Sequence, residues 1–228
     1  MTKVAIMQPT YLPWCGYFAL MEYVDIFVVL DQVQFTKRSW QQRNQIKTNN
    51  GVQWLTVPVL TKGKRDQLIR DVIIDDTVNF SKRHIASIAH NYSKSRYFKE
   101  YSTDILECIE TRNKRLLDLN LSLILRIKEQ LDINTKVIIS SDLGCEGAKD
   151  TLLASICQRL GASEYISPQG SKEYMDKSKE FADKKIPFSY FRFTHPEYTQ
   201  LTNPFIPYMS IVDLLFNCGP DSIKLIKS

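Results

Sequence analysis

Short apolar runs alternate with helical patterns at the start of this 228-residue chain. Lys3–Gln8 and Asp25–Leu30 are rich in aliphatic, β-branched and aromatic residues, which is typical of buried strands. Between them, Gly16–Tyr23 has the composition and length of a short helix. Strand, helix and strand in this order predict a βαβ unit with two parallel strands and a right-handed crossover.

The middle of the chain contains two patterns of different period. Val52–Leu60 alternates as a strand does, and Leu68–Ile74 can pair with it across the turn-forming Lys62-Gly63-Lys64, which predicts an inserted β-hairpin. Apolar residues then recur at helical spacing, which predicts a helical insertion over about residues 81–131. Its expected helices lie near Ser81–Tyr92, Arg96–Glu110 and Asn113–Leu131.

Strands and helices alternate again in the last third of the chain. The predicted elements are strands Lys136–Ser140, Tyr165–Ile166 and Phe188–Phe193, and helices Lys149–Leu160 and Lys172–Ala182. A last apolar helix, Ser210–Phe216, ends at Asn217-Cys218-Gly219-Pro220 because Gly and Pro stop helices. We therefore predict one α/β domain spanning residues 1–228, with a mainly parallel sheet flanked by helices.

Charge is unevenly distributed, although the net charge is only +5. From Gln32 to Arg65 the chain contains no Asp or Glu, and it carries seven cations there: Lys37, Arg38, Arg43, Lys47, Lys62, Lys64 and Arg65. Subtracting these seven from the 30 Lys and Arg leaves 23 against 25 acids. Such a local positive field favours an anionic ligand, for example a nucleotide diphosphate, a phosphopantetheine arm or RNA; the alternative is a solvated basic loop.

Several classes of protein are disfavoured by what the sequence lacks. The apolar run Val4–Met7 is too short for a signal peptide and no stretch approaches a spanning helix, which predicts a cytoplasmic protein with no membrane partner. Five widely spaced cysteines without a C-x-x-C pair predict reduced thiols and no metal. The absence of G-x-G-x-x-G, Walker, G-x-S-x-G and H-E-x-x-H motifs argues against dinucleotide redox chemistry, P-loop phosphoryl transfer and serine hydrolysis.

Two polar and aromatic loops are expected at the carboxyl ends of the first two strands, where ligands bind in open parallel sheets. The first loop is stiffened by two prolines, and we expect it to hold a stacked base or sugar and a phosphate, unless it is a hydrophobic plug. Its candidate residues are Gln8, Tyr11, Trp14 and Tyr17.

The second loop begins at Asp31, whose carboxylate either serves a site or caps the next turn. The residues after it combine cations, amides, a hydroxyl and an indole, which together suit the recognition of a phosphorylated ligand. We predict that this strip binds substrate through Gln34, Lys37, Arg38, Ser39, Trp40, Gln42, Arg43, Asn44 and Lys47.

Of the three histidines, His195 has the sequence position that best suits a catalytic residue. It follows the last predicted strand, at the sheet end expected for Gln8 and Asp31. Because an unperturbed imidazole has a pKa of about 6.5, His195 is a candidate base that removes a proton from an attacking amine or hydroxyl; the alternative is a binding or structural hydrogen bond. Tyr198 and Gln200, in the same segment, are expected to contact substrate.

Six segments spread along the chain resemble the WbqC-like family of bacterial proteins. They are Val4–Phe18, Asp31–Thr48, Trp54–Pro58, Leu160–Ser167, His195–Gln200 and Ser210–Pro220. The resemblance implies an enzyme of O-antigen or other surface polysaccharide synthesis that transfers an acyl or aminoacyl group, such as glycyl, to the amine of a nucleotide-linked amino sugar. It also implies that His195 and Asp31 handle protons. The activated donor would come from a carrier protein, CoA or an aminoacyl-tRNA, and no further cofactor is implied.

The start of the chain is also similar to HIGH-motif nucleotidylyltransferases and pantothenate synthetases, in which two histidines stabilise the transferring phosphate. Here Pro13 or Trp14 and Tyr17 occupy the corresponding places. A nucleotide-dependent ligase or nucleotidylyltransferase is therefore one alternative function. A noncatalytic module that binds nucleotide sugars is another.

Overall fold

The computed structural model describes residues 1–227, apart from the side chain of Tyr174. The chain divides into two compact units, each built from three separate segments. The first unit consists of Met1–Gln8, Ala19–Val33 and Asn134–Thr194, and the second of Pro9–Phe18, Gln34–Ile133 and His195–Ser228. That all residues belong to a single domain remains a prediction.

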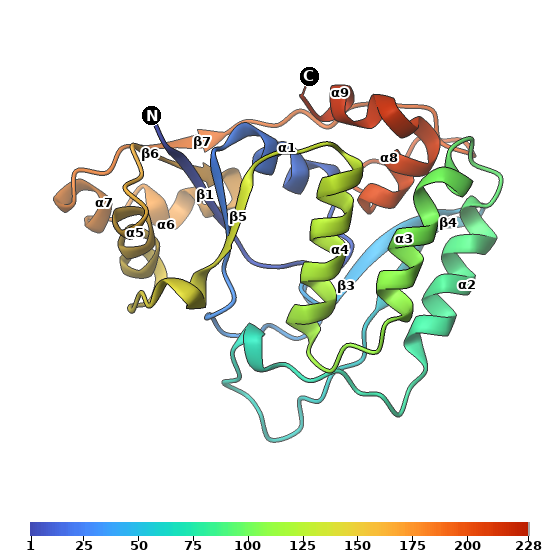
Figure 1. Ribbon diagram of the computed structural model, residues 1–228, viewed down its shortest axis with the longest axis horizontal. Coiled ribbons are helices and arrows are strands. Elements are labelled where there is room, and N and C mark those ends of the chain that lie inside the picture. Colours follow the sequence, from blue (N-terminus) through green and yellow to red (C-terminus); the bar gives the residue numbers. More distant parts are fainter. Residues whose placement is uncertain (228) are drawn as a thin grey trace. The chain divides into compact units, whose positions relative to one another are not determined.

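A five-stranded sheet forms the centre of the first unit (Figure 1). Its strands are β1 (Lys3–Met7), β2 (Ile26–Val29), β5 (Lys136–Ile139), β6 (Glu164–Pro168) and β7 (Phe188–Phe191). Their order is β5-β2-β1-β6-β7, and every neighbouring pair is parallel. β1 occupies the middle, with Val4 opposite both Ile26 and Tyr165. The predicted parallel α/β sheet is thus confirmed.

Helices cover this sheet because its central strands β1 and β2 are nearly continuous runs of buried apolar residues. The helical elements that follow its strands are η2 (Ser140–Leu143), α5 (Lys149–Arg159), η3 (Gln169–Ser171), α6 (Lys172–Met175) and α7 (Glu180–Asp183). Val4 and Val28 of the sheet share one core with Leu152 and Ile156 of α5. Fully burying each such side chain contributes about 1.5–3 kcal/mol. Helix α1 (Cys15–Tyr23) joins β1 to β2, so the predicted βαβ unit is present.

The second unit combines a β-hairpin with helices. Its elements are β3 (Arg43–Thr48), β4 (Gly51–Thr56), η1 (Ile69–Asp71), α2 (Phe80–Tyr92), α3 (Phe98–Glu110), α4 (Leu116–Gln130), α8 (Ile211–Cys218), η4 (Gly219–Asp221) and α9 (Ser222–Lys227). α3 packs between α2 and α4, and it also contacts α8 (Figure 1). The three helices predicted between residues 81 and 131 are all found, with ends within a few residues of those expected.

Two details of the predicted secondary structure are wrong. The strand over residues 52–56 pairs with Arg43–Thr48 across the Asn49-Asn50 turn, not with Leu68–Ile74. Only an isolated bridge between Val59 and Ile74 remains of the expected pairing. Pairing across the Asn49-Asn50 turn is favoured over pairing with Leu68–Ile74 because a short loop closes at less entropic cost than a long one. The helix expected over Lys172–Ala182 is two short helices, α6 and α7.

Among the described residues, no helix is both long enough and apolar enough to cross a lipid bilayer.

Candidate ligand-binding site

Asp31 lies in the first unit, just beyond the carboxyl end of β2, and is almost fully buried. Its Oδ1 accepts hydrogen bonds from the Ser140 hydroxyl at 2.8 Å and from the Ser141 backbone N–H at 3.0 Å. Its Oδ2 accepts one from the Ser141 hydroxyl at 2.7 Å. Since Ser140 follows β5 directly, Asp31 ties the ends of two neighbouring strands together. These contacts are structural, but they join Asp31 to Ser140 and Ser141 of a distant segment and not to the turn that follows Asp31. A catalytic role for Asp31 remains a prediction.

Gln8 also belongs to the first unit and directly follows β1. The chain leaves β1 towards β2 on one side, while β6 pairs with β1 on the other. Parallel sheets bind ligands at such a reversal of strand order, outside the carboxyl ends of the strands. Gln8 therefore lies where the topology of this unit favours a ligand.

The remaining candidate residues all belong to the second unit, where residues 9–18, 34–47 and 195–200 contact one another. The ring of His195 stacks on Trp14, with centroids 6.3 Å apart and planes at 11°. Tyr198 and Tyr208 also pack against this imidazole, with centroids at 6.3 Å and 4.9 Å. His195 is thus the middle of an aromatic cluster.

Both ring nitrogens of His195 lie within hydrogen-bonding distance of the backbone. The N–H of Tyr208 donates to Nε2 at 3.0 Å, and Nδ1 lies 2.8 Å from the carbonyl oxygen of Pro196. Because Nε2 accepts, Nδ1 carries the proton in the neutral ring. Burial lowers the pKa of His195, an effect that the Pro196 carbonyl and the charge of Asp213 partly oppose. The imidazole is accordingly held neutral, with its basic nitrogen covered by a backbone N–H.

Tyr11 and Tyr17 are core residues of the second unit rather than open stacking faces. Both are fully or almost fully buried, and burial raises the pKa of each hydroxyl. The Tyr11 hydroxyl lies 2.8 Å from Nδ1 of His84, a buried histidine of α2. Desolvation, followed by the charge of Arg83, lowers the pKa of His84 to about 4.

A buried carboxylate, Asp213 of α8, organises the polar groups around it. Oδ2 accepts from the Tyr92 hydroxyl at 2.8 Å, and Oδ1 accepts from the Tyr198 hydroxyl at 3.0 Å and from Nε2 of Gln200 at 2.9 Å. Burial raises the pKa of Asp213, although these three donors and the charge of Lys47 oppose the shift. Asp213 was not a sequence candidate, and its one signal was a lone acid inside the apolar run Ser210–Phe216.

Lys47 extends the same network. Its ammonium donates to Oε1 of Gln200 at 2.8 Å, to the carbonyl of Pro204 at 2.6 Å and to the carbonyl of Thr202. Desolvation lowers the pKa of Lys47, against the charge of Asp213. The three donor positions of the ammonium are all used. The contacts of Lys47, Gln200 and Tyr198 therefore fasten residues 198–204 to the hairpin and α8.

Several polar residues of the basic strip are likewise committed to the fold. Nδ2 of Asn44 donates to the carbonyl of Leu12 at 2.6 Å, and Nε2 of Gln42 donates to that of Val57 at 3.1 Å. Ser39 bonds to the Thr36 carbonyl at 2.7 Å. These contacts shape the turn over residues 36–42, which leaves other members of the strip exposed.

The exposed members are Lys37, Arg38, Gln34 and Trp40, and Arg43 is half-exposed. Trp40 retains 50% of its accessible surface and Trp54 of β4 retains 41%, with ring centroids 5.3 Å apart. The guanidinium of Arg43 lies 4.2 Å from the Trp54 ring centroid. Nε of Arg43 is buried and has no hydrogen-bond partner in the described part of the chain. We call Trp40, Arg43 and Trp54 the tryptophan platform.

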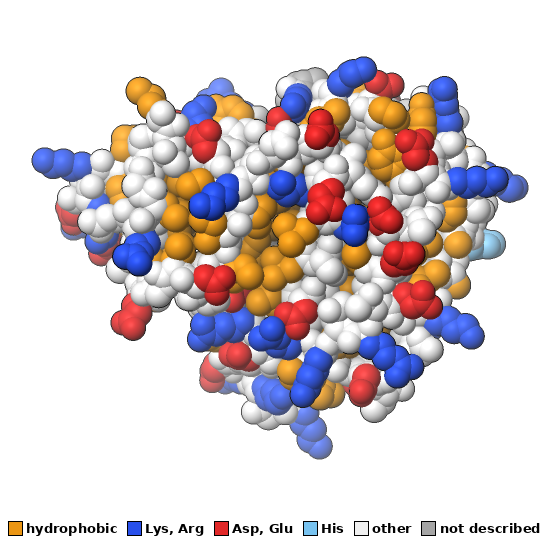
Figure 2. Space-filling view, viewed as in Figure 1, with side chains coloured by type: hydrophobic (Ala, Val, Ile, Leu, Met, Phe, Trp, Pro, Cys, Tyr) orange, Lys and Arg blue, Asp and Glu red, His pale blue; other side chains and the backbone are white. Residues whose placement is uncertain are grey.

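The tryptophan platform is suited to a flat or phosphorylated ligand. Exposed indoles stack on nucleobases or sugars, and a guanidinium can donate two parallel bonds to a phosphate. Figure 2 shows Lys and Arg side chains, with Asp and Glu side chains among them, over the segment between β4 and α2. This segment contains Lys62, Lys64 and Arg65 and also Asp66, Asp71, Asp75 and Asp76. Trp54 was not among the sequence candidates because it lies in an expected strand, where aromatic residues are common.

The residues that the structure describes contain no group of three or more His, Cys, Asp or Glu side chains arranged to hold a metal ion. All five cysteines are free, and burial raises the pKa of the Cys15 thiol to about 12. A thiol held protonated in this way is a poor nucleophile at neutral pH.

The fold and these surfaces define an α/β protein with a parallel-sheet unit and a helical unit that carries the tryptophan platform. The WbqC-like protein family matches residues 8–225, and this chain belongs to that family. The chain is also 39% identical over 224 residues to the uncharacterized protein Rv1507c of Mycobacterium tuberculosis, covering 97% of this chain and 96% of the relative. No solved structure shows significant similarity to it.

Proposed function

We propose that this protein is an acyl- or aminoacyltransferase that modifies the amine of a nucleotide-linked amino sugar in surface polysaccharide synthesis. The tryptophan platform is the observation that carries the proposal. Two exposed indoles, with Arg43 over one of them, offer a stacking face and a cation to a base and its diphosphate. Lys37 and Arg38, on the adjoining turn, supply further charge.

The proposed reaction is the acyl transfer that the family resemblance implies, and His195 is its proposed base. The sugar amine attacks the acyl carbon of the donor, and the C–S or C–O bond to the carrier breaks. The amine proton passes to Nε2 of His195 and then to the leaving thiolate or alkoxide. This step requires Nε2 to release the N–H of Tyr208, which now occupies it.

That same contact favours a second candidate function. If Tyr208 never leaves Nε2, His195 is a structural residue and the protein is a noncatalytic nucleotide-sugar binding module. The two functions share the tryptophan platform and differ only in whether a product forms.

Binding is tested by titrating the protein with UDP-glucosamine and following tryptophan fluorescence and heat. We expect Trp54→Ala and Arg43→Ala each to weaken binding by about 1–3 kcal/mol, the worth of one stacked base or one charge-assisted contact. Tyr23→Ala and Arg83→Ala, which remove an exposed aromatic residue and an exposed arginine elsewhere, serve as controls. Equal affinities in all four variants would remove the basis of the proposal.

Catalysis is tested by incubating UDP-glucosamine with acetyl-CoA or glycyl-tRNA, with and without ATP, and measuring product mass. An acylated sugar nucleotide formed without ATP supports transfer. Binding without any product supports the module. Product formed only with ATP would point to the nucleotide-dependent ligase instead.

A further inference from the structure

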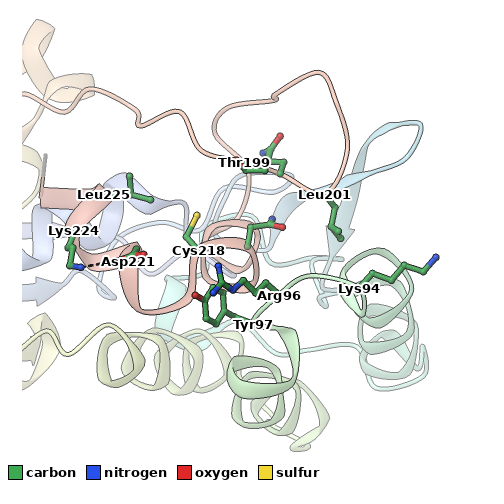
Figure 3. A pocket seen from close by; sticks show the side chains of 11 residues that line it. Lys94, Arg96, Tyr97, Thr199, Leu201, Cys218, Asp221, Lys224 and Leu225 are labelled. Atoms are coloured by element: carbon green, nitrogen blue, oxygen red, sulfur yellow. Dashed lines mark hydrogen bonds and ion pairs between the residues drawn. The ribbon is translucent and has the colours of Figure 1, made fainter.

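The second unit contains an open groove of about 900 Å³ that shares no residue with the tryptophan platform or the aromatic cluster of His195. Its walls come from the α2–α3 connection, residues 199–201, the end of α8 and the η4–α9 segment (Figure 3). This volume falls within the range of small-molecule sites.

Cations dominate the charged residues of this groove. Lys94, Arg96 and Lys224 line it, and Asp221 is the acid among its lining residues. Asp221 pairs with Lys224 at 2.8 Å, and the charge of Arg96 also acts on this carboxylate. Among the described residues, no carboxylate lies within 4.0 Å of the cationic groups of Arg96 and Lys94. In Figure 3 the amine of Lys94 points away from the other lining side chains, whereas Arg96 lies beside Tyr97 below Cys218. Arg96 is therefore the cation best placed to meet a ligand.

The surroundings of Arg96 are rigid. Its guanidinium lies 5.1 Å from the centroid of the Tyr97 ring. The backbone N–H of Tyr97 donates to the carbonyl of Phe216 at 3.0 Å, and a Cβ added at Gly219 would meet the Tyr97 ring at 2.4 Å. The ring is thus fixed against the end of α8, and it offers Arg96 a preformed face.

The other lining groups provide neutral polar and apolar contacts. Nδ2 of Asn217 donates to the backbone carbonyl of Asp213 at 2.7 Å. Oδ1 of Asn217 can accept a hydrogen bond from another group. Leu201 and Leu225 supply apolar surface. Burial raises the pKa of the Cys218 thiol to about 11, so Cys218 is protonated at neutral pH and does not act as a nucleophile. The groove is suited to binding rather than covalent chemistry.

We infer that this groove binds a small phosphorylated ligand, with Arg96 on a phosphate. Lys224 of α9 reaches a further oxygen with the ammonium protons that its pair with Asp221 leaves unused. Cations on two different elements suit a phosphate ester or diphosphate, whose oxygens diverge, better than one planar carboxylate. The organic part of the ligand rests on Tyr97, Leu201 and Leu225. The inference does not depend on the proposed transferase activity.

The test is calorimetric titration of the full-length protein with inorganic pyrophosphate. We expect binding that weakens as salt is added. Arg96→Ala should reduce affinity about tenfold or more, the equivalent of one charge-assisted hydrogen bond. Arg112→Ala is the matched control because it removes an exposed arginine at the other end of α3. Arg96→Lys keeps the charge and should lose less affinity.

Two further measurements keep this inference separate from the proposed function. Arg43→Ala removes the cation that the tryptophan platform would offer to a diphosphate, and Arg43 does not line the groove. Pyrophosphate binding that persists in Arg43→Ala and is lost in Arg96→Ala therefore belongs to the groove. Equal affinity in Arg96→Ala and Arg112→Ala would overturn the inference, as would no detectable binding at millimolar pyrophosphate. Tighter binding of a single-stranded RNA oligonucleotide, lost in Arg96→Ala, would also overturn it, since the groove would then be part of a nucleic-acid surface.

Discussion

The backbone N–H of Tyr208 donates a 3.0 Å hydrogen bond to Nε2 of His195. This contact fixes the neutral tautomer, and it covers the nitrogen that a base would use. Tyr208 itself adopts a positive φ of 62°, a conformation that costs a non-glycine residue free energy. A role for His195 as a base would therefore require the residues around Tyr208 to withdraw.

If His195 is the base of the proposed transfer, its pKa sets the acid limit of the reaction. Burial lowers that pKa below 6.5, so the imidazole is neutral at pH 7, and kcat/KM should fall only as the pH drops below about 6.5. His195→Gln should lower kcat by about 10²–10⁴-fold with little change in KM, measured under saturating donor. His90→Gln, at an exposed histidine of α2, is the control. An unchanged rate in His195→Gln would leave His195 with a structural role only.

His84 makes the second unit sensitive to acid. Its folded-state pKa of about 4 lies below the unfolded value of about 6.5, so the unfolded chain binds the proton first. The neutral ring contributes full stability above pH 6.5, and this contribution of up to about 3 kcal/mol disappears as the pH falls towards 4. Urea unfolding at pH 7 and pH 4 should show a smaller loss for His84→Gln than for wild type. His90→Gln should lose as much as wild type, and equal losses in all three proteins would contradict the assignment.

The hydroxyl of Tyr92 joins two buried groups at once. It accepts from the backbone N–H of Lys47 at 2.9 Å and donates to Asp213 at 2.8 Å. Tyr92→Phe leaves a buried N–H and a buried carboxylate each short of a partner, so we expect a loss of about 1–3 kcal/mol in unfolding free energy. The Tyr23 ring is half-exposed, so Tyr23→Phe should change the unfolding free energy by less than about 0.5 kcal/mol. A similar effect of both changes in denaturant titrations would show that the network contributes little.

Gly219 allows a close approach as well as a left-handed backbone. Its φ is +51°, and a Cβ there would lie 2.4 Å from Cγ of Tyr97. Gly161 has a φ of +62° but open space around it, so alanine at Gly161 measures backbone strain alone. We expect Gly219→Ala to lower the melting temperature more than Gly161→Ala. Overpacking against the Tyr97 ring should cost about 1–3 kcal/mol of unfolding free energy in addition to the backbone strain. Matching shifts in calorimetry would mean that the Tyr97 ring moves aside freely.

Local periodicity determined much of the fold from the sequence. Strands β1, β2 and β5 and helices α2, α3 and α4 each carry an uninterrupted pattern, and all were predicted within a few residues. The hairpin was mispaired because the run after Arg43 is polar enough to suggest a loop. In β3 this polarity alternates between two faces, with Asn44 buried and Arg43 half-exposed beside Trp54.

The sequence by itself determined that residues 31–47 are basic and aromatic, that the sheet is parallel and that His195 is set apart from the other histidines. Only the tertiary structure decided which of these polar residues are free to meet a ligand. Lys47 bonds to Pro204, 157 residues away, and Tyr92 to Asp213, 121 residues away. A periodic pattern reports which face of an element is apolar, but the partner of a buried charge depends on which distant segments the fold brings to it.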